Sequence, residues 1–273
     1  MLITSIVNDV SKEGIKAEHG LSLLIEMDRH NILFDSGKSD LVIENLAILN
    51  KDVKNIDYLI ISHSHYDHTG GVKAFLENNE KAKILMQTTA FKDRYSQTKD
   101  GDYRFSGFDR KVLSFERLSK LNHVSKIDSS LLLFSNVSPK YPMPENNKSL
   151  FEKIDNRYVL DFFEDEQSAV LYENGKYCLI SGCSHLGILN ILEKAEELTN
   201  HTMDYVFGGF HLYSHSTGKT ESIESIRFIA SELKKRKTKY YTMHCTGLGP
   251  YQELKNVLAD QIEYLYGGDN VKI

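Results

Sequence analysis

Three histidines and an aspartate stand within six positions of one another, directly after an apolar run. Residues 62–71 read S-H-S-H-Y-D-H-T-G-G. Because alternate residues of an extended chain share a face, His63 and His65 point the same way, and Asp67 and His68 turn toward a second point. Imidazoles and carboxylates bind zinc-like ions, and burying so many imidazoles without a metal leaves costly unpaired polar groups. The motif predicts half of a dinuclear metal site at the end of a buried strand.

Three later strand-like runs also end in a histidine. Their ends carry His185, His211 and His244, and Cys183 stands two residues before the first of them. Small residues at each end allow the chain to turn tightly there. A site for two metals needs ligands from outside the first loop. These strand ends supply the candidates.

Short strand-like runs alternate with helical stretches along the rest of the chain. Apolar spacing predicts strands at 21–27, 31–34, 56–61, 204–207 and 239–243, and helices at 41–49, 70–79, 186–198, 222–235 and 250–259. Asn174-Gly175 stands between two β-rich runs and predicts a hairpin turn. The pattern is α/β in composition with hairpins mixed in, and we expect one domain over residues 1–273.

The stretch at about 87–166 differs from its surroundings. It contains three of the four prolines, Gly101, Gly107 and the polar run P-E-N-N-K-S at 144–149. Long segments of this kind are uncommon in compact domains unless they are functional or disordered. We interpret the stretch as an insertion or lid that shapes a pocket; a surface excursion without a role is the alternative.

Composition narrows the functional classes. The 273 residues are 41% hydrophobic and 26% charged, with a net charge of −5, which is typical of a soluble globular chain. The one dense basic cluster, at 234–237, closes a predicted helix, where it suits the helix dipole. We expect a small-molecule substrate, no nucleic acid and no membrane, because no apolar run approaches about 20 residues. Three cysteines and the absence of a secretory signal predict a cytoplasmic location.

Two motifs give the chain a family resemblance. Residues 63–68 match the HxHxDH motif of the metallo-β-lactamase superfamily, and Asp35-Ser36-Gly37 resembles its first motif. The resemblance implies an α/β (α+β) fold, a four-layer αββα sandwich with the metals at one edge between the sheets. Further segments at 17–22, 182–185, 208–212 and 244–247 resemble the dihydropteroate-synthase-like branch, which includes methanopterin-pathway dihydropterin synthases.

The same resemblance implies roles for the site residues. The superfamily ligands fall on His63, His65, Asp67 and His68, and its final metal histidine falls on His244. In the first motif, the aspartate braces the metal loop, which is the role implied for Asp35.

The sequence departs from the family pattern at one ligand. A histidine that the superfamily places before its bridging aspartate has no counterpart at 163–167, and Cys183 occupies the bridging position. We predict that His185 is the compensating ligand. Cys183 is either a bridging thiolate or a small buried residue that supports the turn. For His211, the alternatives are a metal contact, a substrate-facing acid and a core histidine.

Other residues receive weaker assignments. His19 either reaches the mouth of the site or makes a structural hydrogen bond. Surface positions are predicted for His30, His123, His201 and His215, and also for Tyr66 and Arg94, with substrate contact as the alternative for the last two.

The site predicts an enzyme. A metal pair makes hydroxide available near neutral pH and polarises a carbonyl or phosphoryl oxygen, so we expect a hydrolase that uses a bridging hydroxide on a phosphoester or related bond. Asp67 and His211 are the candidate catalytic residues. Zinc is the first expectation for the two ions, with manganese, iron and nickel as alternatives. A transferase that uses a pterin methyl diphosphate and a non-catalytic metal-binding or sensory protein are the other functions considered.

Overall fold

Two sheets form the centre of the molecule. The computed structural model describes residues 1–109, 115–119 and 121–273. The first sheet contains, in spatial order, β18 (Asn270–Lys272), β1 (Leu2–Val7), β2 (Ser22–Glu26), β3 (Asn31–Phe34), β4 (Tyr58–Ile60), β5 (Lys83–Leu85) and β8 (Leu118–Ser119). The second contains β17 (Ile262–Tyr264), β16 (Lys239–Thr242), β15 (Tyr205–Gly208), β14 (Lys176–Ile180), β13 (Ser168–Glu173), β10 (Leu131–Phe134) and β9 (Val124–Lys126).

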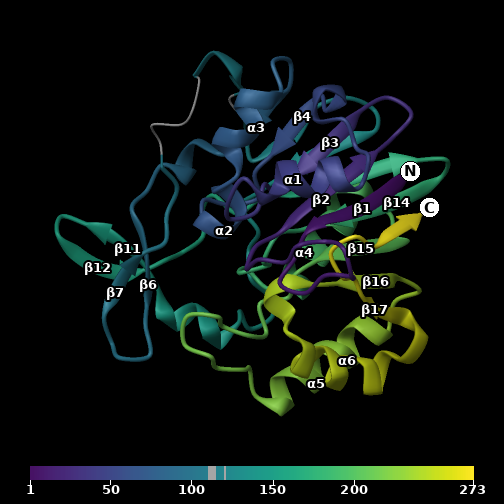
Figure 1. The fold of residues 1–273 in the computed structure, drawn as a ribbon. Coiled ribbons are helices and arrows are strands. Elements are labelled where there is room, and N and C mark those ends of the chain that lie inside the picture. Colours follow the sequence, from purple (N-terminus) through teal and green to yellow (C-terminus); the bar gives the residue numbers. More distant parts are fainter. Residues whose placement is uncertain (110–114, 120) are drawn as a thin grey trace.

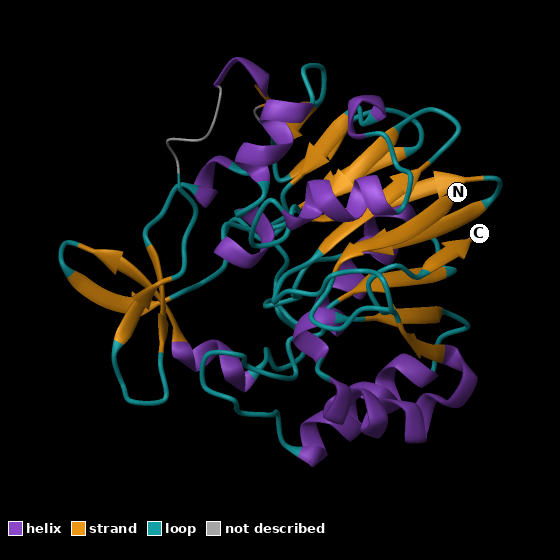
Figure 2. Cartoon of the chain, viewed as in Figure 1, coloured by secondary structure: helices purple, strands orange, loops and turns teal. Residues whose placement is uncertain are grey.

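Helices cover the outer face of each sheet (Figure 2). The first sheet packs on α1 (Leu41–Ile48) and α3 (Val72–Asn78), and the second packs on α4 (Ile188–Thr199), α5 (Ile223–Lys234) and α6 (Leu248–Leu258). Consecutive residues of a strand pack on opposite faces of its sheet. In β14, Leu179 packs against the helices and Ile180 packs between the two sheets. The predicted four-layer αββα sandwich is confirmed.

Local sequence signals explain where helix α5 begins and where the chain turns between β13 and β14. Ser222 caps α5 by accepting a hydrogen bond from the backbone N–H of Ser225 at 3.1 Å. The predicted hairpin joins β13 to β14, and Asn174 and Gly175 both have positive φ, 52° and 77°, as a type I′ turn requires. The predicted strands and helices listed above agree with the structure to within a few residues at their ends.

The stretch predicted as one insertion, 87–166, divides in the structure. Its strands β8, β9 and β10 pair into the two main sheets. The others, β6 (Arg94–Gln97), β7 (Tyr103–Phe105), β11 (Leu150–Ile154) and β12 (Arg157–Leu160), form a separate four-stranded sheet in the order β12-β11-β6-β7. Figure 1 shows this small sheet set apart from the sandwich. Residues 110–114 and 120 of the stretch lie outside the described residues.

Strand direction brings the site residues together. In the first sheet, β3 and β4 are parallel, and β1 runs in the same direction because both β1 and β3 are antiparallel to β2. In the second sheet, β14, β15 and β16 are parallel. The carboxyl ends of each set therefore meet at one edge of its sheet, and the loops from both edges build the site.

The helices of the described residues are too short or too polar to span a bilayer.

Candidate metal centre

Three buried imidazoles converge at the end of β4 and β14. His63 Nε2 lies 3.0 Å from His65 Nδ1 and 3.2 Å from His185 Nε2. Burial lowers the pKa of all three histidines, that of His65 to about 3, so the rings are neutral at physiological pH. Neutral imidazole is the form that binds a metal ion.

A second group lies beside the first. It consists of Asp67 and His68 on α2 (Tyr66–Thr69) and His244 after β16. Asp67 Oδ2 lies 3.3 Å from His244 Nε2 and 3.8 Å from His68 Nε2. Burial acts to raise the pKa of Asp67, but His68, His19 and His244 outweigh it and hold this pKa well below its usual range, so the carboxylate is charged.

Cys183 stands between the two groups. Its Sγ lies 3.1 Å from His68 Nε2. It lies within 4.8 Å of the ligand atoms of His63 and His185 on one side and of His68 and His244 on the other. Cys183 could therefore help to hold ions on either side, and it lies in the position for which the family resemblance implies a bridging ligand.

Hydrogen bonds to the outer ring nitrogens orient the imidazoles. Asp35 accepts from Ser62 Oγ and from His68 Nδ1, each at 2.7 Å. Because the Ser62 hydroxyl donates to this carboxylate, its oxygen accepts from His63 Nδ1 at 2.9 Å. Asp35 therefore fixes two rings, as the family resemblance implies, and leaves the lone pair of each Nε2 pointing into the site.

Two further residues orient the rings of His185 and His244. The Asn147 amide donates to the carbonyl oxygen of His185 at 2.7 Å, and its Oδ1 accepts from His185 Nδ1 at 3.1 Å. Asp9 Oδ1 lies 2.6 Å from His244 Nδ1, and His244 Nε2 is buried without a hydrogen-bond partner.

The arrangement fits two metal ions. Ring nitrogens of His65 and His185 lie 3.0 and 3.2 Å from His63 Nε2, and the Nε2 atoms of His65 and His244 are buried without a hydrogen-bond partner. Unpaired buried polar atoms of this kind are costly when no ligand pairs with them. Cations bound to these nitrogens would remove that cost. The donor set of imidazoles, one carboxylate and one thiol is suited to zinc and neighbouring transition metals. One ion would be held by His63, His65 and His185, and the other by Asp67, His68 and His244. Cys183 lies between these two groups.

Backbone strain is concentrated at this edge. Asp35, Ser184, His211 and His244 all have left-handed φ, between 49° and 61°. Residues with a side chain rarely adopt this conformation, and such strain is frequent at functional sites.

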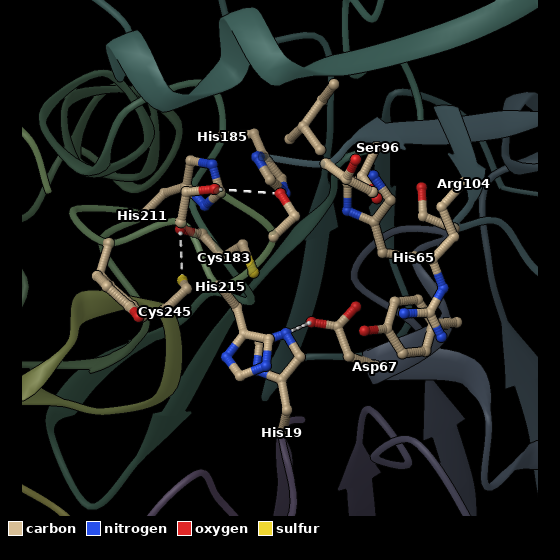
Figure 3. Close-up of a pocket in the computed structure, with 17 residues that line it drawn as sticks. His19, His65, Asp67, Ser96, Arg104, Cys183, His185, His211, His215 and Cys245 are labelled. Atoms are coloured by element: carbon tan, nitrogen blue, oxygen red, sulfur yellow. Dashed lines mark hydrogen bonds and ion pairs between the residues drawn. The ribbon is translucent and has the colours of Figure 1, made fainter. Parts of the chain in front are cut away.

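A cavity of about 290 Å³ opens over the candidate ligands. Figure 3 shows His65 and Asp67 on one side of it and His211 and Cys245 on the other, with Cys183 between them. Both ring nitrogens of His211 are buried without a hydrogen-bond partner, and one lies within 4.8 Å of the thiols of Cys183 and Cys245. His211 is thus free to act on a metal or on a molecule in the cavity.

The mouth of the cavity contains two histidines. His19 Nε2 lies 3.2 Å from Asp67 Oδ2, an ion pair drawn in Figure 3, and its Nδ1 lies 3.0 Å from Asp9 Oδ2. The ring of His215 stacks on His19 with the centroids 4.0 Å apart. His215 is exposed, as predicted, but it also lines the cavity, a setting that its sequence neighbourhood did not indicate.

The prediction of a surface position for Arg94 is wrong. The side chain is fully buried. Its Nε donates to Ser64 Oγ at 2.6 Å, and it forms ion pairs with Asp165 at 2.5 Å and with Asp161. Asp165 in turn accepts from the backbone N–H of Ser64 at 2.9 Å. Arg94 therefore stabilises the histidine loop through Ser64 and Asp165 and does not contact a substrate in this buried position.

Sequence reasoning missed several supporting residues. Besides Asp9, Ser62 and Asn147, they include Glu166, which accepts the backbone N–H groups of His185 and Leu186 at 2.6 and 2.8 Å. Burial raises the pKa of Glu166 to about 7. For Asp9 the sequence offered one signal, its position: Asn8-Asp9 directly follows β1, whose carboxyl end lies at the edge of the sheet that carries the site.

The fold and this site together define the chain as a metallo-β-lactamase-type protein. The family model of the metallo-beta-lactamase superfamily matches residues 15–148. The chain belongs to this superfamily, which confirms the family resemblance.

Relatives of nearly the same length support this assignment. An uncharacterized protein of Methanocaldococcus jannaschii is 30% identical over 276 residues, which cover 97% of this chain and 100% of that protein. From the same organism, 7,8-dihydropterin-6-methyl-4-(β-D-ribofuranosyl)-aminobenzene-5'-phosphate synthase is 29% identical over 94% of this chain and 90% of its own length. A crystal structure of a metal-dependent hydrolase of the β-lactamase superfamily is similar with a TM-score of 0.84 and 28% identity, covering 100% of this chain and 99% of that one.

Proposed function

We propose that this protein is a metal-dependent hydrolase with a dinuclear site, acting on a phosphoester bond of a small molecule. One observation carries the proposal: two groups of inward-facing ligand atoms flank Cys183, and hydrogen bonds hold the outer nitrogens of four of the rings, those of His63, His68, His185 and His244. Divalent ions bound there, zinc being our first expectation, would polarise a phosphoryl oxygen and supply a water-derived nucleophile near neutral pH. The full-length likeness to a metal-dependent hydrolase supports this class.

The chain's own residues divide the remaining tasks. Asp67 faces the cavity and lies within reach of His19, so it can accept a proton and pass it toward the solvent-exposed mouth. His211 faces the cavity from the opposite side with both nitrogens free. We assign it the role of protonating the leaving group.

A transferase is the second candidate. Its support is the similarity to the dihydropterin-aminobenzene-phosphate synthase over nearly the full length of both chains. The same ligand set would then activate a diphosphate leaving group of a pterin substrate. A non-catalytic metal-binding protein is disfavoured because candidate ligands from both sheets converge around Cys183 next to the cavity.

The decisive experiment joins metal content to turnover. Protein purified without chelator is analysed for metals and assayed with bis(p-nitrophenyl) phosphate before and after metal removal. We expect about two transition-metal ions per chain and metal-dependent hydrolysis. His65→Ala should lose metal and activity, whereas His201→Ala, which changes an exposed histidine stacked on Tyr177, should keep both.

Other outcomes separate the alternatives. Two ions per chain with no phosphoester hydrolysis, but release of diphosphate from a pterin methyl diphosphate that depends on an added aminobenzene ribosyl phosphate acceptor and joins the two, would support the transferase. Full activity in the His65→Ala variant would contradict the site assignment itself.

A further inference from the structure

The small sheet has two chemically different faces. Ser96 on β6 is paired directly with Arg104 on β7, and residues two apart on a strand share a face. The face that carries Ser96, Thr98, Arg104 and Ser106 lines the cavity over the candidate metal centre. The other face carries aromatic rings in mutual contact, those of Tyr95, Phe105, Tyr103 and Tyr158. The sheet therefore turns its polar face, not its apolar face, toward the cavity.

Two hydroxyls on the cavity face have no partner. Ser106 is 3% exposed, and its Oγ is buried without a hydrogen bond. Thr98 Oγ1 is also buried and unpartnered. Leaving such a group unpaired costs stability, so unpaired hydroxyls at a cavity wall indicate a ligand that accepts from them.

A cation lies next to these hydroxyls. Arg104 is exposed at the cavity, and in the described part of the chain no carboxylate forms an ion pair with it. Figure 3 shows Arg104 and Ser96 on the His65 and Asp67 side of the cavity, away from His211.

The polar face is held firmly against the metal loop. The backbone N–H of Ser106 donates to the backbone carbonyl of Arg94 at 2.9 Å, and the carbonyl of Ser106 accepts from the N–H of Tyr66 at 3.0 Å. Tyr66 is the first residue of α2, which carries Asp67 and His68. The small sheet and the candidate ligands therefore keep a fixed spacing, as a binding site with two contact points needs.

We propose that the cavity face of the small sheet is a phosphate subsite, distinct from the metal centre. Its residues are Ser96, Thr98, Arg104 and Ser106. A guanidinium paired with a phosphate is a strong, charge-assisted contact, and the hydroxyls supply donors for the other oxygens. The proposal rests on the proposed function and narrows it: the substrate is a small molecule with a second phosphate group, separated from the phosphoryl group that reacts at the metals.

Binding of matched probes to the metal-loaded protein tests the subsite. Calorimetry compares methylphosphonate, which has one anionic group, with alkane bisphosphonates whose groups are separated by one to four methylenes. At least one bisphosphonate should bind about tenfold or more tightly than methylphosphonate. Arg104→Gln should abolish this gain and leave methylphosphonate binding unchanged. Ser106→Ala should reduce the gain.

Arg157→Gln is the control, because Arg157 is an exposed arginine of the same small sheet outside the cavity. It should keep the gain. The proposal is overturned if no bisphosphonate exceeds methylphosphonate by more than the statistical factor of about two, if Arg104→Gln retains the gain, or if Arg157→Gln loses it equally. If the native protein shows no phosphoesterase activity but binds a bisphosphonate more tightly than methylphosphonate in an Arg104-dependent way, the proposed hydrolase is overturned and the phosphate subsite is supported.

Discussion

At the scale of single residues, the geometry of the candidate site depends on side chains outside the ligand set. Asp35 and Ser62 together orient His63 and His68, and Gly182 leaves the space in which they meet. A Cβ at position 182 would lie 2.2 Å from Ser62 Oγ and 3.4 Å from Asp35 Oδ2. Real Cβ atoms do not approach a hydroxyl so closely, so the serine would have to move and release the ring of His63.

We therefore predict that Gly182→Ala lowers metal content and activity. The overpacked core should also lose about 1–3 kcal/mol of unfolding free energy. Elemental analysis and urea unfolding measure the two effects. Gly249→Ala is the matched control: a Cβ there meets nothing within 4 Å, and the residue lies in α6. If both variants bind metal equally, the positioning role of the Asp35–Ser62 pair is wrong.

At the scale of elements, a buried arginine joins the small sheet to the histidine loop. Arg94 begins β6, and its guanidinium contacts Ser64 between the first two histidines of the motif. Its carboxylate partners, Asp161 and Asp165, lie on the segment that leads from β12 into β13. The ion cluster therefore ties three segments that are distant in sequence.

Replacing this arginine should be severe. Arg94→Met leaves two buried carboxylates without their counter-ion, and removal of one partner of a buried ion pair typically costs about 3–5 kcal/mol. Urea unfolding followed by circular dichroism measures the change. Arg157→Met on the exposed edge strand β12 should stay within about 0.5 kcal/mol of the native protein. Equal stability of both variants would show that the cluster is dispensable.

At the scale of the whole molecule, the candidate ligands come from both halves of the sandwich. His63, His65, Asp67 and His68 follow a strand of the first sheet, whereas Cys183, His185 and His244 follow strands of the second. Ions held between them would connect the two sheets at one edge. Metal binding should therefore stabilise the entire fold, because the unfolded chain has no such assembled site.

Removing the metals should lower the melting temperature. At free metal one hundred times the dissociation constant, a single site contributes about 2.7 kcal/mol, which corresponds to a fall of about 5 °C for a chain of this size. Differential scanning calorimetry before and after chelation measures it, and restoring metal should reverse it. The His65→Ala variant should respond less. An unchanged melting temperature in the native protein would argue against ions that join the sheets.

The sequence by itself determined the strand and helix pattern, the family and most of the candidate ligands. Local signals carry this information: strand alternation, the Asn174-Gly175 turn, and three imidazoles with a carboxylate in one short segment. These depend on neighbours along the chain, so they can be read without coordinates. His63, His65 and Asp67 were recognisable for this reason.

Only the tertiary structure decided which residues support those ligands and what faces the cavity. Asp9, Asn147 and Glu166 lie far from the motif in sequence and meet it only because the strand ends of both sheets share one edge. Arg94 and Arg104 lie on adjacent strands of one small sheet, yet Arg94 is buried in an ion cluster and Arg104 faces the cavity. Both are arginines in polar segments, and composition cannot separate them, because burial and partners arise from contacts between segments distant in the chain.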